Sequence, residues 1–96
     1  MARVELSLAA VEDLDALIRS HSLPDDTHER VRRSLPPLAR FPRMGPELAG
    51  RWAGFCFLLG PWRWMVLVYL HMEQEDRVVA VTVQDARSSG AATGHR

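Results

Sequence analysis

LLGPWRWMVLVY at residues 58–69 and DRVVAVTVQDAR at residues 76–87 are the two stretches that decide the fold of this chain. Both are rich in β-branched, aromatic and other large apolar residues, which is typical of strands. With the apolar run just before them, they predict three consecutive strands joined by two tight turns, at residues 55–59, 62–71 and 77–84. Apolar residues occupy both faces of these strands, so we expect the sheet to be covered on both sides.

Upstream, the apolar spacing changes to that of a helix. Residues 3–6 alternate weakly and predict a short first strand, and Ser7 can cap a helix that ends near Ser22. The acidic residues Glu12, Asp13 and Asp15 are expected to face outward. The predicted buried stripe consists of Leu8, Val11, Leu14 and Ile18.

A second helix is predicted after Pro24, where Asp26 and Glu29 have the spacing of a capping box. Its buried stripe would be Val31, Leu35 and Leu38. Pro36 and Pro37 should break or kink this helix, because proline lacks the N–H and clashes with the preceding turn. We expect Leu38 to point into the core all the same. The two helices would be antiparallel, joined by residues 21–24.

The predicted architecture is α+β: an N-terminal strand, then a two-helix hairpin packed on a mainly antiparallel four-stranded sheet. Residues 40–54, with their prolines and glycines, are expected to be a connecting loop. A chain of 96 residues has room for one domain. We place that domain at residues 1–88, followed by a flexible C-terminal tail at 89–96.

Composition excludes several classes of protein. The single cysteine, Cys56, excludes an intramolecular disulfide, and no spacing resembles a zinc site. The longest apolar run, residues 65–70, is too short to span a bilayer. We therefore expect a cytoplasmic protein without metal, cofactor or membrane contact.

The net charge of zero hides an uneven distribution of charge. All twelve basic residues are arginines, and seven of them lie between positions 30 and 63 against one acid, Glu47. Such a basic middle can attract a polyanion or an acidic protein. A solvated, arginine-rich helix face is the alternative interpretation, and the sequence leaves both open.

Three segments, in this order, resemble the RelE/ParE superfamily of type II toxin–antitoxin toxins. They are ARFPRMGPELAG at residues 39–50 and the two stretches quoted first. The resemblance covers roughly residues 3–88. It implies a toxin that inhibits growth and is neutralised by a cognate acidic antitoxin. Because the apolar sheet and the basic middle need a cover, we expect the antitoxin to bury on the order of 1,500 Å² or more.

The RelE-like branch implies ribosome-dependent cleavage of mRNA without a metal. In that reaction the 2′-hydroxyl attacks the adjacent phosphate, and arginine suits the crowded phosphorane because its fork donates two hydrogen bonds and keeps its charge. Arg63 resembles the strand arginine of that branch and Arg87 the arginine after its last strand, so both are candidate catalytic residues. Alternation would put Arg63 on the strand face of Tyr69. Arg51 and Arg43 are candidate nucleic-acid-binding residues, although Arg51 can equally be a solvated side chain.

The chain also departs from that branch. Phe55, Cys56 and Phe57 stand where such nucleases usually carry lysines, and no tyrosine lies near the C-terminus. The PRMG stretch at 42–45 suits the ParE-like branch, which inhibits DNA gyrase by binding. A degenerate toxin that only forms the antitoxin complex is a third alternative. His21 and His28 are interpreted as structural or solvent-facing.

The tryptophans are open to two interpretations. Trp62 and Trp64 would share one strand face, which favours an aromatic core under the helices. The alternative is an exposed patch for antitoxin or RNA stacking.

Overall fold

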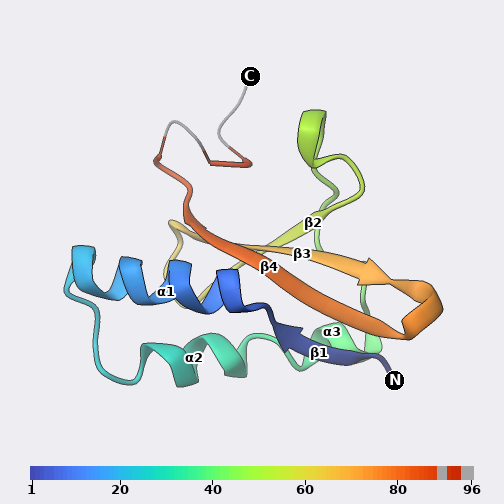
Figure 1. The fold of residues 1–96 in the computed structure, drawn as a ribbon, viewed down its shortest axis with the longest axis horizontal. Helices are drawn as coiled ribbons and strands as arrows, with labels where there is room; N and C mark the ends of the chain where they lie inside the picture. The colour runs from blue at the N-terminus through green and yellow to red at the C-terminus, as the bar shows by residue number, and fades with distance from the viewer. Residues whose placement is uncertain (89–90, 94–96) are drawn as a thin grey trace.

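The computed structural model describes residues 1–88 and 91–93 and has an α+β architecture (Figure 1). Two longer helices and a short third helix follow the first strand, and three further strands complete the chain. The elements are β1 (Arg3–Leu6), α1 (Leu8–His21), α2 (Thr27–Arg33), α3 (Pro37–Arg40), η1 (Gly50–Trp52), β2 (Cys56–Leu59), β3 (Met65–Met72), η2 (Glu73–Glu75) and β4 (Arg77–Asp85).

The four strands form one sheet in the order β1-β4-β3-β2. The pairs β2–β3 and β3–β4 are antiparallel, whereas β1 pairs with β4 in parallel, so the sheet is mixed. The predicted α+β fold is confirmed, with β1 as the exception to its antiparallel character. Strand β3 begins at Met65 instead of residue 62, because the N–H of Met65 donates to the carbonyl of Trp62 at 2.9 Å and closes a turn there.

Helix α1 follows its predicted boundaries. The Ser7 hydroxyl accepts from the Ala10 N–H at 3.0 Å, and Ser22 ends the helix in a left-handed conformation with φ of 51°. The predicted buried stripe is wrong at Leu8, which is 74% exposed. The core side of the helix runs through Ala10 and Leu14. Leu8 lies two residues before Ala10, which is about 200° of rotation and therefore the opposite side.

Asp13 also differs from its predicted outward orientation. Its carboxylate accepts a hydrogen bond from the Thr82 hydroxyl and one from the Val83 N–H at 3.3 Å, both on β4. These bonds tie α1 to the sheet through a polar contact at the border of the core. Asp15 Oδ1 lies 2.8 Å from His28 Nε2, and this contact joins α1 to α2.

The predicted break at the two prolines is confirmed. Helix α2 ends at Arg33, α3 begins at Pro37, and Leu38 is buried at 1% exposure. The start of α2 is predicted correctly, but the capping box is wrong. Asp26 makes no side-chain cap, because its carboxylate accepts from Arg30 Nε at 3.0 Å one turn later.

Both faces of the sheet are covered, as the apolar strands predict. On β3, the side chains of Met65, Leu67 and Tyr69 join the core beneath the helices, and those of Val66 and Val68 join a second core. The loop before β2 and the segment 91–93 cover this second face. Its remaining members are Leu48, Trp52, Phe55, Phe57, Val81, Ala86 and Ala92.

Of the expected tail at 89–96, the structure describes residues 91–93. There Ala91 and Ala92 are buried, and the Ala92 N–H donates to Gln84 Oε1 at 2.7 Å. The rest of that expected tail lies outside the described residues.

Candidate functional site

Arg63 and Arg87 lie at the same end of the β3–β4 hairpin. Arg63 is exposed in the turn two residues before β3, and Arg87 follows the end of β4. Met65 and Asp85 are opposite one another in the register of these strands, so the two arginines lie at the same end of the two central strands. Arg63 is not on the strand face of Tyr69, because β3 begins only after it.

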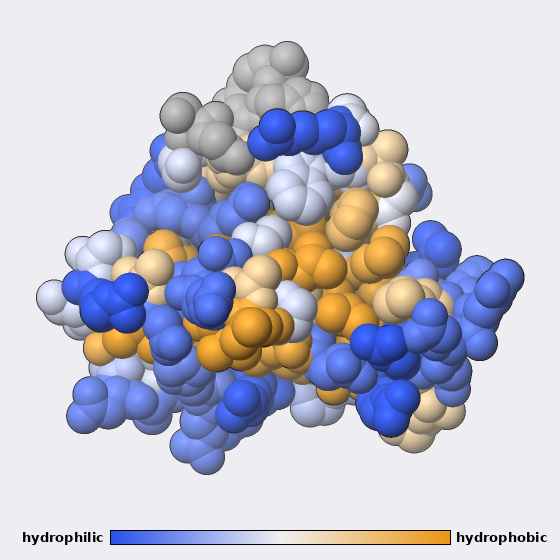
Figure 2. Space-filling view, in the orientation of Figure 1, coloured by the Kyte–Doolittle hydropathy of each residue, from blue (hydrophilic) through white to orange (hydrophobic). Residues whose placement is uncertain are grey.

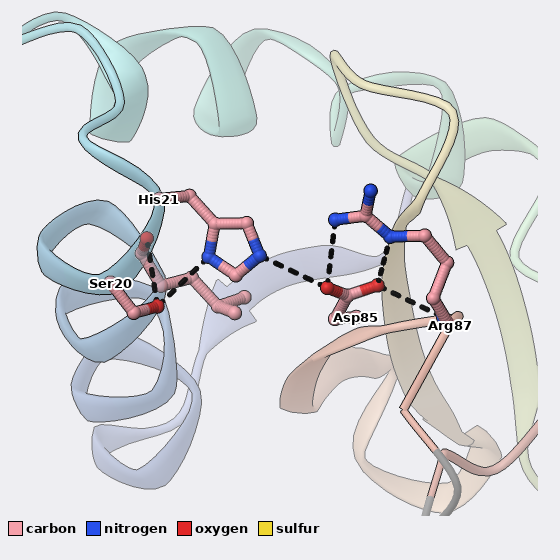
Figure 3. Close-up of polar contacts among 5 residues, drawn as sticks. Ser20, His21, Asp85 and Arg87 are labelled. Atoms are coloured by element: carbon pink, nitrogen blue, oxygen red, sulfur yellow. Dashed lines mark hydrogen bonds and ion pairs between the residues drawn. The ribbon is translucent and has the colours of Figure 1, made fainter.

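The Arg87 guanidinium is bound by Asp85 (Figure 3). Arg87 Nε and Nη2 donate to the two carboxylate oxygens at 3.0 and 2.9 Å, and the Arg87 N–H donates at 2.9 Å. The two residues are only two positions apart, so this pairing is local in the sequence. Asp85 also contacts His21 Nε2 at 3.0 Å. Its side chain is only 17% exposed, whereas that of Arg87 is 63% exposed.

The hydrogen bonds from the Arg87 side chain hold the pKa of Asp85 well below its usual range, since they favour the ionised carboxylate. The backbone N–H of Arg87 and the contact with His21 act in the same direction, against the desolvation that opposes them. The Nε and Nη2 side of the Arg87 guanidinium, which could otherwise bind a phosphate, is already occupied by the Asp85 carboxylate.

An aromatic stack adjoins this ion pair. The rings of His21 and Trp64 stack with centroids 4.5 Å apart, and Arg87 Cζ lies 5.0 Å from the Trp64 ring centroid. Trp62 stacks on Trp64 at 6.3 Å, with Arg30 Cζ 5.7 Å from its ring. Both tryptophans are half-buried against the core beneath the helices, so the core interpretation holds for their inner faces. We call this set, Arg30, Trp62, Trp64, His21, Asp85 and Arg87, the arginine–tryptophan cluster.

Arg43 and Arg51 lie elsewhere. Arg43 Nη2 is 3.9 Å from Glu73 Oε2, just beyond the far end of β3. The eight residues of β3 span about 26 Å, so Arg43 and Arg87 belong to opposite ends of the hairpin. Arg51 is exposed on η1, beside the loop that covers the second core. The structure thus brings Arg63 and Arg87 to one end and separates both from Arg43.

The positions where lysines would be expected are apolar and packed. Cys56 is buried beneath the helices, while Phe55 and Phe57 pack against the second core. The chain has no lysine, and its one tyrosine, Tyr69, is buried with its hydroxyl oxygen accepting from the Gly45 N–H at 3.0 Å. Burial raises the pKa of Tyr69. None of these side chains is placed to take or give a proton at Arg87.

The role of His21 could not be read from the sequence. Its ring links the end of α1 to the end of β4, 64 residues later, and no local pattern signals such a contact. Its other ring nitrogen, Nδ1, lies 2.8 Å from the Ser20 hydroxyl (Figure 3). The histidine is structural here, as interpreted, and it serves to hold Asp85.

Residues 1–88 and 91–93 contain neither a group of side chains suited to a metal ion nor a helix that could span a bilayer. Within these ranges no three His, Cys, Asp or Glu side chains gather closely enough to hold a metal ion. No described helix has the length and apolar character needed to span a bilayer.

The chain has the fold of solved RelE toxins. It aligns with the RelBE2 toxin–antitoxin complex from Mycobacterium tuberculosis at a TM-score of 0.62 and 24% identity, over 88% of this chain and 96% of that one. For the intact E. coli RelBE complex the TM-score is 0.64 at 14% identity, over 92% and 100% of the two chains. A metal-bound toxin from Helicobacter pylori gives 0.64 at 21% identity, over 88% and 94%. No protein-family model matches the sequence, and no curated protein matches it either.

Proposed function

We propose that this chain is the toxin component of a type II toxin–antitoxin system and that it inhibits growth in the cytoplasm. The observation that carries the proposal is its near-complete coverage of a fold found in solved toxins and in toxin–antitoxin complexes. The three quoted segments, arranged in the order typical of these toxins, support it independently.

An acidic antitoxin is the proposed partner. Met1 and Leu8 are large apolar side chains left exposed near β1 and α1, and apolar side chains reach the surface in the middle of the face seen in Figure 2. A pocket of about 540 Å³ lies between β1 and the segment that joins α2 to α3, and Arg32 is part of its wall. The wall also includes Glu5, so the pocket itself suits the apolar side of an amphipathic segment, and the acidic character of the partner rests on the arginine-rich middle of the chain.

Cleavage of mRNA on the ribosome is one proposed mode of action. Arg63 and Arg87 would stabilise the charge that develops on the attacked phosphate, with Arg51 and Arg43 as further contacts to the nucleic acid. In this mode the phosphate would displace Asp85 from Arg87 or bind the guanidinium N–H donors that Asp85 leaves free. The mode also requires a proton acceptor, which would be another group because the chain has no lysine and its one tyrosine, Tyr69, is buried.

Inhibition by binding, with DNA gyrase as the candidate target, is the second mode. The Asp85–Arg87 pair is the specific observation in its favour, because two of the five guanidinium N–H donors of Arg87 are already bound to a carboxylate. The packing of Phe55 and Phe57 in the second core points the same way. A degenerate toxin that only binds its antitoxin would share both features.

Induced expression in a bacterial host tests the proposal. We expect growth arrest that co-expression of the neighbouring antitoxin gene relieves. Mapping of mRNA 5′ ends and plasmid supercoiling, measured in parallel, then separate the modes. New mRNA ends that vanish in Arg63→Ala and Arg87→Ala, but not in the exposed control Arg19→Ala, would establish cleavage. Altered supercoiling with intact mRNA would establish inhibition of gyrase, and unimpaired growth would refute the toxin role.

A further inference from the structure

A second pocket lies at the end of the hairpin far from Asp85, and the proposed function uses only its Arg43, as a candidate contact to nucleic acid. It is open, has a volume of about 490 Å³ and lies where the chain leaves α3. Its apolar side chains are exposed, Phe41 at 59% and Met44 at 52%. The pocket is lined by Arg40, Phe41, Pro42, Arg43, Met44 and His71. Arginine, phenylalanine and methionine are enriched where proteins contact one another.

Hydrogen bonds fix the backbone of this segment. The Phe41 N–H donates to the Pro37 carbonyl at 2.9 Å, and the Met44 N–H donates to the Phe41 carbonyl at 3.1 Å. Gly45 then lies so close to β2 that a Cβ there would be 2.1 Å from the Phe57 carbonyl oxygen. The exposed side chains are thus presented by an ordered backbone, which lowers the entropy lost on binding.

The polar side chains around the pocket have few ion-pair or hydrogen-bond partners among the described residues. Within residues 1–88 and 91–93, Arg40 has no carboxylate partner. Arg43 has Glu73 at 3.9 Å, a contact between two largely exposed side chains that contributes little. His71 also lines the pocket, and its buried Nδ1 has no hydrogen-bond partner among the described residues.

We propose that this pocket is a docking site for an acidic peptide segment of a partner protein. One large apolar side chain of the segment would lie against Phe41 and Met44, and its flanking carboxylates would pair with Arg40 and Arg43. A peptide fits better than a nucleic acid, because a nucleic acid carries a phosphate at every nucleotide and Glu73, Glu75 and Asp76 just beyond β3 would repel that continuous charge. A peptide needs carboxylates only beside Arg40 and Arg43, and the one beside Arg43 would displace Glu73. The inference goes beyond the toxin proposal and does not depend on it.

Fluorescence anisotropy with a fluorescein-labelled synthetic peptide, Asp-Glu-Leu-Phe-Glu-Asp-amide, tests the site on the full chain. We expect saturable binding with a Kd below about 1 mM that weakens as salt is added. Phe41→Ser and Arg40→Glu should each weaken binding by about tenfold. Leu59→Ser and Arg19→Glu make the same changes at exposed sites on β2 and α1 and should leave the Kd unchanged.

Two competing probes decide the class of ligand. A peptide with lysine in place of each acidic residue should not bind. Labelled oligouridine of about eight nucleotides should bind more weakly than the acidic peptide. Tighter, Phe41-dependent binding of the oligouridine would overturn the proposal in favour of single-stranded nucleic acid. Equal loss of peptide binding in the two control variants, or no saturation at about 1 mM, would also overturn it.

Discussion

The two ends of the β3–β4 hairpin carry similar residue types in opposite states. At the end near Asp85, an arginine, a histidine and two tryptophans are bound to one another and to a carboxylate. At the other end, Arg40, Phe41 and Met44 lie exposed, and the Nδ1 atom of His71 has no hydrogen-bond partner within residues 1–88 and 91–93. Arginine and aromatic residues therefore do not mark a binding site by their presence. What differs is whether the chain itself supplies their partners.

The largest loss of stability is expected for a substitution at the end of the hairpin near Phe41 and Met44, which we call the open end because its side chains are exposed. Gly45→Ala would place a Cβ 2.1 Å from the Phe57 carbonyl oxygen and 2.9 Å from Tyr69 Oη. Because the nearest atom is backbone, the loop or β2 must move, and we expect a loss of about 3 kcal/mol in the free energy of unfolding. Urea unfolding followed by circular dichroism measures it.

Gly54→Ala is the matched control for that variant. Gly54 has φ of +91°, but a Cβ there would meet no atom within 4 Å. The substitution should cost only the conformational strain, about 1 kcal/mol. Equal losses in both variants would contradict the close approach of Gly45 to the Phe57 carbonyl as the cause of the larger effect.

Asp85→Asn tests how much the contacts of Asp85 stabilise the other end of the hairpin, which we call the closed end because its side chains contact one another. The amide keeps the shape of the carboxylate but loses the charge-assisted hydrogen bonds from Arg87, and we expect a loss of about 2 kcal/mol. The more exposed Asp15→Asn, which removes the pairing with His28, should cost under about 1 kcal/mol. Thermal unfolding of the two variants gives the comparison, and a neutral Asp85→Asn would contradict the structural role assigned to this carboxylate.

Acid should weaken the closed end selectively. The folded-state pKa of Asp85 is lowered, chiefly by the Arg87 side chain, so its contribution to stability is present above the unfolded pKa of about 4. That contribution is lost as the pH falls towards the folded pKa. Urea unfolding at pH 6, 4 and 3 should therefore show the gap between wild type and Asp85→Asn narrowing as the pH falls. A gap that stays constant would mean that another group carries the effect.

The smallest change in the free energy of unfolding is expected for Glu73→Gln. Glu73 and Arg43 are 3.9 Å apart and more than half exposed, so their pairing should contribute under about 0.5 kcal/mol. Stability should be unchanged, while binding of the acidic peptide should improve because Arg43 is released. Weaker binding in this variant would show that Glu73 holds Arg43 in its binding orientation.

Features set by neighbours in sequence were predictable. The cap at Ser7, the end of α1 at Ser22, the break at the two prolines and the pairing of Asp85 with Arg87 each depend on residues a few positions apart. These follow from local steric and hydrogen-bonding rules that hold in most folds.

Features set across the fold were not predictable. Asp13 looks like a solvent-facing helix residue until Thr82 is placed beside it, and His21 has no local sign of its partner Asp85. Leu8 shows the same limit, because its spacing fits a helix stripe whose orientation only the sheet decides. The predicted hairpin is enough to place Arg63 and Arg87 at the same end of the sheet. The separation of Arg43 from both could not be predicted.

The parallel pairing of β1 with β4 joins residues 3–6 to residues 77–80. The β1 strand therefore has no partner strand until β4 has been synthesised. Contacts of such long sequence separation form late and slow the folding of small domains. While it is being translated, this chain therefore lacks the strand that completes its sheet. The hairpin of β3 and β4 that aligns Arg63 with Arg87 is also missing until then. A nascent chain that ends before β4 has no complete sheet, and an activity that needs both Arg63 and Arg87 begins only once β4 has been synthesised.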